Sequence, residues 1–402
     1  MRTETYIRKS LGMKAHYVTR VEESEREVVA QVERIPHRRL RCGRCGLDAK
    51  RTKGRTENPR RWRDEAMLSK WLVIEYRPWR VVCPVCGVVT EEIPWSERWS
   101  RLTRRLAQSI AAMSKDRDWK AVAKFYQVDW KTVLAVIRRA VERGLACRNL
   151  KPVRWIGIDE VSRKKGHEYL TLVYDLKHSE LLWIGQGRKE ETLEGFFSWL
   201  GKRRSAHIEV VCMDMWKPYL NAVRAHAPQA TVAFDRFHLV QHLNAAVDEV
   251  RRSLVRKLSD RFRALVKGTR FVLLKNPWNL TPKQKQQLNA LVRSNSPLSR
   301  AWYLKEDFQR FFDYVSEGWA TKHLKHWLGW AARSRLEPFK RMARMVRNHL
   351  DGILAWTKIR VTNGAVEGMN NKVKLVSHRA FGFRNVENYK TAIYHCCANL
   401  PA

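Results

Sequence analysis

The chain is poor in acidic residues and lacks any long apolar run. Asp and Glu number 40 against 78 Lys and Arg, which gives 402 residues a formal net charge of +38. No apolar run approaches the ~20 residues that a membrane-spanning helix needs. The opening MRTETYIRKS also lacks the apolar core of a secretory signal. These absences argue against membrane-embedded and secreted proteins, and we expect a soluble protein of the cytoplasm with no membrane partner.

What is present suggests a folded protein that binds nucleic acid. Hydrophobic residues make up 44% of the chain, enough for real cores, and its length suggests about two to four domains. The positive charge is spread along the whole length and is accompanied by 17 Trp and 11 Tyr. Phosphates require neutralising cations and bases stack on aromatic rings, so DNA or RNA is the favoured partner. Charge alone would also allow an anionic membrane surface.

The eight cysteines are used unevenly. Two CxxC pairs, each followed by glycine, occur as CGRCG (Cys42, Cys45) and CPVCG (Cys83, Cys86). This pattern is typical of a zinc ribbon, in which four thiolates close the coordination sphere of a structural Zn²⁺. Disulfides are disfavoured in a reducing compartment, and a redox pair would need a surrounding βαβ pattern. The other cysteines are not spaced as a ligand set: Cys147, Cys212, Cys396 and Cys397.

The segments around these cysteines are predicted to be short strands. HYVTRVEE and REVVAQVERI alternate apolar and polar residues on either side of a Glu/Ser turn, which predicts a hairpin. Between the two CxxC pairs, Arg and Lys are interleaved with Trp62, Trp71, Tyr76 and Trp79. These aromatics either form the small core of the ribbon or contribute to a DNA-facing surface.

Residues 118–144 carry apolar positions at helical spacing with a break near Gln127. This pattern predicts a helix-turn-helix, with Ala123 in the first helix and Gln127 where a turn glycine is usual. Trp130, Lys131 and Thr132 would then lie at the exposed start of the recognition helix and contact DNA. Helical pairs of this kind also occur without any DNA role.

From residue 152 the pattern changes to alternating strands and helices in the order β-β-β-α-β-α-β. Three apolar runs end in acids, namely VRWIGID at Asp159, HIEVVCMD at Asp214 and TVAFD at Asp235. Ends of strands carry functional groups because the sheet holds them rigidly while they stay open to solvent. Asp175 also ends a strand, where a turn residue is the simpler interpretation.

Residues 236–358 are predicted to be almost wholly helical, with breaks at Pro277, Pro282 and Pro297. The stretch TNGAVEGMNNKVK follows, with Thr362 or Asn363 as a helix cap and Glu367 within the first turns. A lone glutamate among basic and amide side chains is usually a surface residue in an i,i+4 pair.

Four motifs resemble those of bacterial insertion-sequence transposases of the ISL3 group, which belong to the DDE class: GIDE, CMDMWKPY, FDRFHLVQHLN and TNGAVEGMNNKVKLVSHRAFGFRN. The resemblance covers nearly the whole chain. It implies an RNase H-like catalytic domain interrupted by a helical insertion, with Asp159, Asp214 and Glu367 as the catalytic triad. Asp235 and His238 match a further Asp-x-x-His motif. For these two residues an accessory role, a helix cap and a polar helix face all stay open.

The expected fold is therefore multidomain. It comprises a β-rich zinc ribbon (1–95), an all-α helix-turn-helix (96–150) and an α/β RNase H-like domain with a mixed sheet (151–238 and 359–402). An all-α insertion (239–358) interrupts the last of these.

The triad also makes chemical sense. Three clustered acids repel one another unless divalent cations compensate them. Two Mg²⁺ (or Mn²⁺) ions per active site would stabilise the attacking and leaving oxygens of a phosphodiester. Glu160 is left out because adjacent strand residues point to opposite faces. DNA would be met by Asn370, Lys372 and Lys374.

The predicted function is transposition of DNA in a bacterial, nucleoid-associated setting. The protein would bind terminal inverted repeats and target DNA, cleave and transfer strands, and work as a homodimer or higher oligomer on DNA. The alternative is a non-catalytic zinc-ribbon and helix-turn-helix regulator derived from a transposase. A third class, an RNase H-like nuclease acting on RNA hybrids or junctions, suits the two N-terminal DNA modules poorly.

Overall fold

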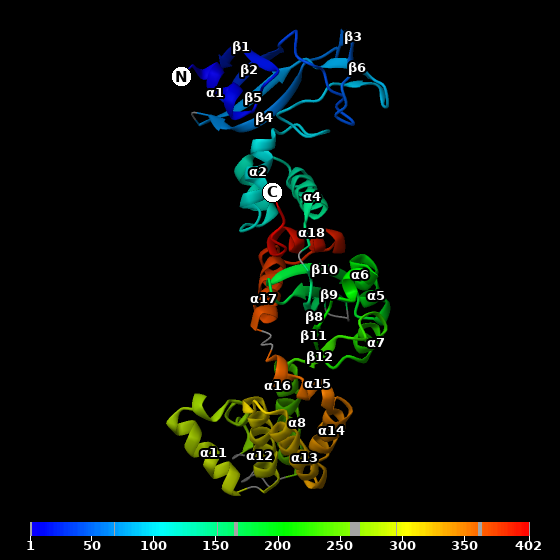
Figure 1. Ribbon diagram of the computed structural model, residues 1–402. Coiled ribbons are helices and arrows are strands. Elements are labelled where there is room, and N and C mark those ends of the chain that lie inside the picture. Colours follow the sequence, from blue (N-terminus) through cyan, green and yellow to red (C-terminus); the bar gives the residue numbers. More distant parts are fainter. Residues whose placement is uncertain are drawn as a thin grey trace. The chain divides into compact units, whose positions relative to one another are not determined.

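The structure is a computed structural model (Figure 1) that describes residues 2–67, 69–150, 152–164, 168–257, 266–294, 296–360 and 364–401. The chain divides into two compact units, Met1–Ala146 and Cys147–Pro401. Among the described residues, no helix combines the length and the apolar character needed to cross a membrane.

The first unit begins with helix α1 (Thr3–Ser10) and a four-stranded sheet in the order β1-β2-β5-β4. Strands β1 (His16–Glu23) and β2 (Glu27–Arg34) form the predicted antiparallel hairpin. Strand β5 (Lys70–Tyr76) pairs in parallel with β2 and antiparallel with β4 (Arg60–Met67). The buried face packs Trp62, Tyr76 and Trp95 against Ile7 of α1, which supplies the core of this small domain.

A second, three-stranded sheet carries the cysteines. It contains β3 (Lys50–Arg55), β6 (Trp79–Cys83) and β7 (Gly87–Thr90), with β6 in the centre. The aromatics between the two CxxC pairs fall into two groups. Trp62 and Tyr76 are buried in the core, whereas Arg63 lies 3.7 Å from the ring centre of Trp71 and Arg51 lies 3.3 Å from that of Trp79.

Three helices complete the first unit: α2 (Arg104–Met113), α3 (Trp119–Tyr126) and α4 (Trp130–Cys147). Between α3 and α4, Gln127 adopts the left-handed conformation, with φ 50° and ψ 48°, at the place where glycine is usual. Arg63 donates a hydrogen bond to the carbonyl of Gln127 (2.9 Å), and the Trp71 indole donates one to its side chain (3.2 Å). Two strands of the first sheet, β4 and β5, thus stabilise the turn between α3 and α4 by hydrogen bonds to Gln127.

The second unit contains a five-stranded mixed sheet in the order β10-β9-β8-β11-β12. Strands β8 (Trp155–Lys164), β9 (Glu168–Asp175) and β10 (Glu180–Gln186) form an antiparallel meander. Strands β11 (Val210–Met213) and β12 (Thr231–Phe234) run parallel to β8. Helices α5 (Glu190–Leu200) and α7 (Lys217–His226) cover one face and α17 (Gly364–Arg379) the other (Figure 1), while the short α6 (Lys202–Ser205) follows α5. The predicted order of strands and helices and the mixed sheet are confirmed.

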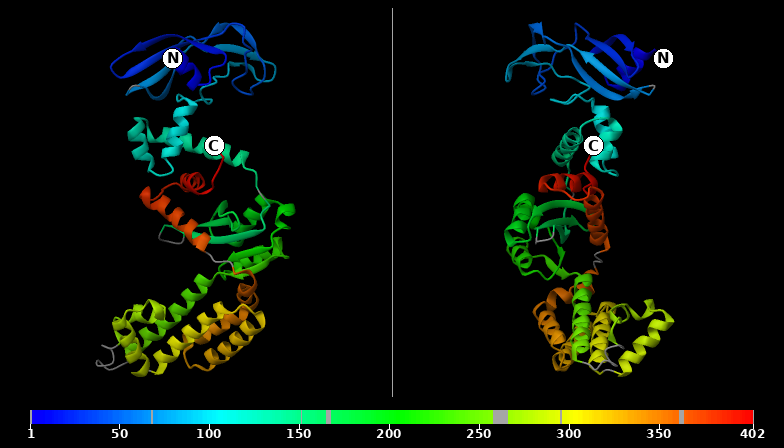
Figure 2. Two further views of the ribbon diagram at one scale, coloured as in Figure 1. Left: turned by 60° about the vertical axis from the view of Figure 1, so that its left-hand side comes forward. Right: turned by 180° about the vertical axis from the view of Figure 1, so that it is seen from behind.

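A helical region separates β12 from α17. Helix α8 (Arg236–Lys257) leads from the sheet into it (Figure 2). The helices and helical turns that follow are α10 (Arg270–Leu274), η1 (Pro277–Asn279), α11 (Pro282–Ser294), α12 (Ser296–Arg310), η2 (Phe311–Asp313), α13 (Glu317–Arg333), α14 (Glu337–Asn348), α15 (Leu350–Leu354) and α16 (Trp356–Ile359). Breaks occur where the prolines predict them.

One hydrophobic core runs from the sheet into the helical region, from Ile156 through Phe308 and Trp327 to Trp356. The two parts meet closely at Gly352, where an added Cβ would lie 2.3 Å from the ring of Phe234. Helix α18 (Val386–Cys397) completes the unit and packs against α17 and β10.

Candidate catalytic and metal-binding sites

Three aspartates form a row across neighbouring strands at one edge of the mixed sheet. Gly157 of β8 pairs with Cys212 of β11, and Met213 pairs with Phe234 of β12. If the same pairing continues past these residues, Asp214 lies opposite Asp159 on one side and opposite Asp235 on the other. We call these three residues the aspartate row. Asp214 and Asp235 directly follow the ends of their strands, as predicted. Strand β8 was expected to end at Asp159 but continues to Lys164, because β9 pairs with it along that whole length.

Asp159 is held by two hydrogen bonds. Its Oδ1 accepts from the backbone N–H of Glu160 at 2.6 Å, and its Oδ2 accepts from the side-chain amide of Asn370 on α17. Burial raises the pKa of Asp159. A cation bound to this carboxylate would favour its ionised form and so oppose the effect of burial.

The amide of Asn370 has only one usable orientation. The hydroxyl of Tyr174 donates to Asn370 Oδ1 at 2.7 Å, so the NH₂ group must face Asp159. Burial raises the pKa of Tyr174 well above its usual value, which keeps this hydroxyl protonated and donating. Asn370 is itself buried, so its predicted contact with DNA gains no support from its position. Lys372 and Lys374 lie exposed on the same helix.

His238 lies between the other two members of the row. Its Nδ1 is 3.8 Å from Asp214 Oδ2, and its Nε2 is 3.7 Å from Asp235 Oδ2. Asp235 is buried, and its Oδ1 accepts the backbone N–H of Phe237 at 3.0 Å at the start of α8. Asp235 thus both caps α8 and contacts His238. His242, one helical turn after His238, is exposed.

Glu160 directly follows Asp159 on β8 but contacts other elements than Asp159 does. Burial raises the pKa of Glu160, a hydrogen bond from Tyr219 opposes this rise, and Arg188 lies 3.9 Å away. Arg188 also lies against Tyr169 and Trp216, with 4.3 and 5.0 Å to the ring centres.

Glu367 lies in α17, three residues before Asn370. Residues three apart share one face of a helix, so the backbone position of Glu367 lies one turn from the contact with Asp159. The side chain of Glu367 and the predicted caps Thr362 and Asn363 lie outside the described residues.

The predicted DNA contacts of the helix-turn-helix occupy the first turn of α4. Trp130 and Lys131 are exposed and Thr132 is half-buried. The backbone N–H of Lys131 donates to Asp129 Oδ1 at 2.7 Å, which caps this turn.

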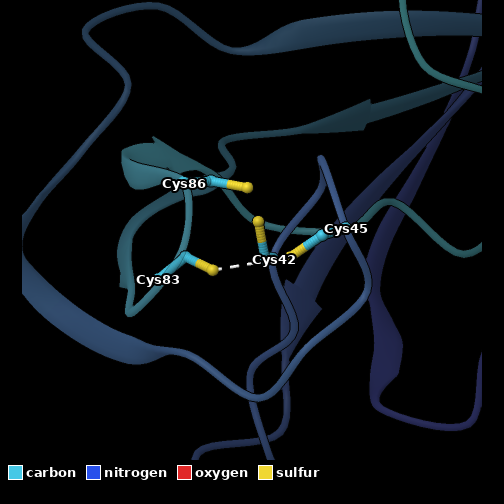
Figure 3. Close-up of side chains that lie close together, drawn as sticks. All are labelled: Cys42, Cys45, Cys83 and Cys86. Atoms are coloured by element: carbon cyan, nitrogen blue, oxygen red, sulfur yellow. Dashed lines mark hydrogen bonds between the residues drawn. The ribbon is translucent and has the colours of Figure 1, made fainter.

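The four predicted zinc ligands lie together in the first unit (Figure 3), with all their sulfur atoms within 4.8 Å of one another. Cys83 ends β6, and Sγ of Cys45 and Cys83 are 3.5 Å apart. A tetrahedral zinc with bonds of about 2.3 Å would separate its sulfurs by roughly 3.8 Å, so this set fits the ion. Within the described residues no other cysteine joins such a cluster.

Backbone geometry supports this cluster. Gly46 and Gly87 have φ of 74° and 69°, as the glycines after CxxC pairs require. The N–H of Arg44 donates to Cys42 Sγ at 3.3 Å. Burial raises the pKa of Cys42, but hydrogen bonds from the backbone of Cys45 and Arg44 outweigh this effect and lower the pKa to about 7.

Models of known protein families match residues in both units. A family model described as a transposase matches residues 156–393, which span the mixed sheet, the helical region and most of α18. A second model, described as the helix-turn-helix domain of transposase family ISL3, matches residues 91–141. The chain belongs to the ISL3 family of transposases.

Individual transposases of insertion sequences are similar over most of the chain. The transposase for insertion sequence element IS1001 of Bordetella parapertussis is 31% identical over 352 residues, which cover 87% of this chain and 86% of that protein. The transposase for insertion sequence element IS1557 of Mycobacterium tuberculosis is 30% identical over 370 residues, 86% and 83% of the two chains. This protein is thus an ISL3-family DDE transposase with a helix-turn-helix DNA-binding domain, and its family implies a divalent metal.

Proposed function

We propose that Asp159, Asp214 and Glu367 bind two Mg²⁺ ions (or Mn²⁺) and that the protein cleaves DNA at the ends of its own element and joins those ends to target DNA. The observation that carries this proposal is the contact between Asn370 and Asp159, which ties the helix of Glu367 to the aspartate row. The metal ions would supply charge stabilisation for the attacking and leaving oxygens.

The residues of the chain prepare this site before metal arrives. Asn370 and the N–H of Glu160 fix the rotamer of Asp159 and leave lone pairs of both oxygens for a cation. His238 offsets part of the negative charge between Asp214 and Asp235 when it is protonated. Lys372 and Lys374, exposed on α17, would neutralise phosphates beside Glu367.

DNA recognition would reside in the first unit. Trp130, Lys131 and Thr132 begin α4, where side chains of a recognition helix reach base edges of terminal inverted repeats. A Zn²⁺ ion on Cys42, Cys45, Cys83 and Cys86 would stabilise the ribbon and take no part in chemistry, because four thiolates leave no open position. An element has two ends, so we propose a homodimer or higher oligomer on DNA, in the nucleoid of a bacterial cell.

The test is Mg²⁺-dependent nicking and strand transfer with a terminal-repeat duplex. Glu367→Gln keeps the shape of the side chain but removes its charge, so nicking should fall by roughly 10³- to 10⁴-fold, as when one member of a catalytic unit is lost. Asp159→Asn and Asp214→Asn should behave alike, and combining them should add little. DNA binding should persist in all three variants.

The matched control is Glu387→Gln on α18, an exposed glutamate paired with Lys390 at 2.9 Å. It should nick like wild type, since exposed pairs contribute about 0–1 kcal/mol. Near wild-type nicking by Glu367→Gln would end the triad assignment. A wild-type protein that binds the repeats but never nicks would favour the non-catalytic regulator.

A further inference from the structure

Trp99 has an unusual combination of exposure and backbone conformation. Its side chain is 83% exposed, and its φ of 62° lies in the left-handed region. It is the third residue of a tight turn in which the N–H of Ser100 donates to the carbonyl of Glu97 at 3.0 Å. Glycine or asparagine normally occupies such a position, so a bulky aromatic there is strained. The exposed Trp99 side chain gains no burial that would offset this backbone strain, and uncompensated strain of this kind points to a function.

The loop that carries Trp99 is firmly anchored at its base. The Ser96 hydroxyl donates to the carbonyl of Leu102 at 2.8 Å, and the N–H of Leu102 donates to the Ser100 hydroxyl at 3.0 Å. Glu97 pairs with Arg143 of α4, within the same unit. Trp99 is therefore presented on a fixed platform, and little conformational entropy would be lost when it binds a partner.

Beside this loop lies a cavity of about 670 Å³, bounded on its other side by the first CxxC turn. Five arginines line it, and none of them has an ion-pair partner among the described side chains: Arg44, Arg60, Arg98, Arg101 and Arg104. Burial, and then repulsion from Arg101, lower the pKa of Arg60, and a bound anion would oppose both effects.

Acidic residues do not neutralise these arginines. Of the three glutamates in the lining, Glu91 pairs with Arg34 at 2.8 Å and Glu97 pairs with Arg143. Only Glu92 remains to balance five guanidinium groups. The cavity therefore favours an anion with several charges, and guanidinium geometry suits phosphate groups.

We infer that Trp99 and these five arginines, here called the Trp99 site, bind terminal DNA, with the arginines on backbone phosphates and Trp99 stacked on a base that has left the duplex stack. Arg44 lies in the first CxxC turn and Arg98 and Arg101 in the anchored loop, while Arg60 begins β4 and Arg104 begins α2, so five separate backbone positions fix them around one cavity. Base stacking on an exposed ring tolerates any sequence, because every base has a π-face. The inference rests on the proposed binding of terminal repeats but not on the triad.

The experiment uses the full-length protein and a terminal-repeat duplex that carries 2-aminopurine at successive positions. Wild type should change the 2-aminopurine fluorescence at one position or a few adjacent ones. Trp99→Gly should abolish that change and weaken binding by roughly tenfold, the size of one base–aromatic stack. Trp99→Phe should keep most of both effects.

Stability separates this role from a structural one. Glycine adopts a positive φ without steric strain, so the Trp99→Gly protein should melt at the wild-type temperature or above it. A structural role predicts instead a lower melting temperature.

Arg60→Gln should reduce the salt dependence of binding by about one unit of slope in a plot of log K against log salt.

The matched control is Tyr17→Ala, which removes another exposed aromatic of the same unit from a strand of ordinary backbone. It should bind the duplex like wild type. If Trp99→Gly binds with wild-type affinity and leaves the fluorescence change intact, the Trp99 site does not exist. Nicking by Glu367→Gln would instead refute the triad while leaving this inference standing, because the two experiments measure different steps.

Discussion

The cysteine cluster and the contact of Asn370 with the aspartate row join segments that lie at very different distances in the chain. Cys45 and Cys83, which touch across the cluster, are 38 residues apart, whereas Asn370 and Asp159 are 211 residues apart. The cluster lies within one small unit whose core is modest, so metal binding there would be coupled to folding. The aspartate row is supported by the large core of the second unit. Loss of a ligand should therefore unfold the first site but only disable the second.

The strongest test of this contrast is removal of the zinc ligands. Cys42→Ser/Cys83→Ser should abolish zinc binding and unfold the ribbon, since a structural zinc supplies roughly 10 kcal/mol or more to such domains. The measurements are metal analysis and hydrogen exchange of residues 1–95, with residues 152–401 as the internal reference. Cys147→Ser/Cys396→Ser is the matched control and should retain the zinc. Undiminished zinc in the first variant would refute the assignment.

A smaller effect is expected from crowding the first CxxC turn. An added Cβ at Gly43 would lie 2.6 Å from the carbonyl oxygen of Thr90 and 2.8 Å from that of Glu91. Both atoms are backbone and must shift, so Gly43→Ala should lower the free energy of unfolding by about 1–3 kcal/mol. Gly54→Ala, with no neighbour within 4 Å, is the control and should be nearly neutral. Equal urea midpoints for the two variants would show that the turn is free to adjust.

Acid should change the stability of the two units in opposite directions, through His16 in the first unit and Asp159 in the second. Burial, and then Arg34, lower the pKa of His16 to about 3. The folded pKa lies below the unfolded value of 6.5, so this contribution is complete above pH 6.5 and is lost as the pH falls towards 3. The loss should reach about 2 kcal/mol at pH 5. For Asp159, whose pKa burial raises, protonation instead relieves a cost of folding in metal-free protein.

Urea unfolding at pH 7 and pH 5, at saturating zinc, checks this response. His16→Phe should flatten the pH dependence of the first unit, because a neutral ring keeps the edge contacts with Tyr76 and Trp95. His37→Gln, which changes an exposed histidine of the same unit, should leave it unchanged. A His16→Phe protein with the full wild-type pH dependence would show that another group titrates.

The smallest expected effect concerns the support of Asp159. Tyr174→Phe removes the hydroxyl that orients the Asn370 amide. The Mg²⁺ concentration for half-maximal nicking should rise about tenfold, the lower end of the effect of losing a supporting hydrogen bond around a metal ligand. Terminal DNA binding should not change. Tyr303→Phe, on the exposed surface of α12, is the control; an unchanged Mg²⁺ requirement in Tyr174→Phe would mean that Asp159 needs no such support.

Patterns that are local in the chain were predictable. The CxxC spacing anticipated the cysteine cluster, alternation anticipated the β1–β2 hairpin, and apolar runs anticipated the succession of strands and helices in the second unit. The prolines anticipated the breaks between helices. Each of these features depends on residues close in sequence, where backbone geometry and hydrophobic period act directly.

Features that depend on distant partners were missed or misjudged. Asp159 was expected at a strand end, but pairing with β9 extends the strand to Lys164. Asn370 was expected to face DNA, but Tyr174 and Asp159 engage it inside the protein. Gln127 replaced a turn glycine because Arg63 and Trp71, far earlier in the chain, stabilise its left-handed backbone.

The sequence by itself determined the family, the four-cysteine cluster and the kinds of domain, because these depend on residue type and short spacing. Only the tertiary structure decided that the aspartates share one row, that an asparagine binds Asp159, and that Arg44 and Arg60 join the arginines near Trp99 around one cavity. Those facts follow from strand register, burial and the absence of nearby counter-charges among the described side chains. All of these are set when segments far apart in the sequence pack together, and no local pattern encodes them.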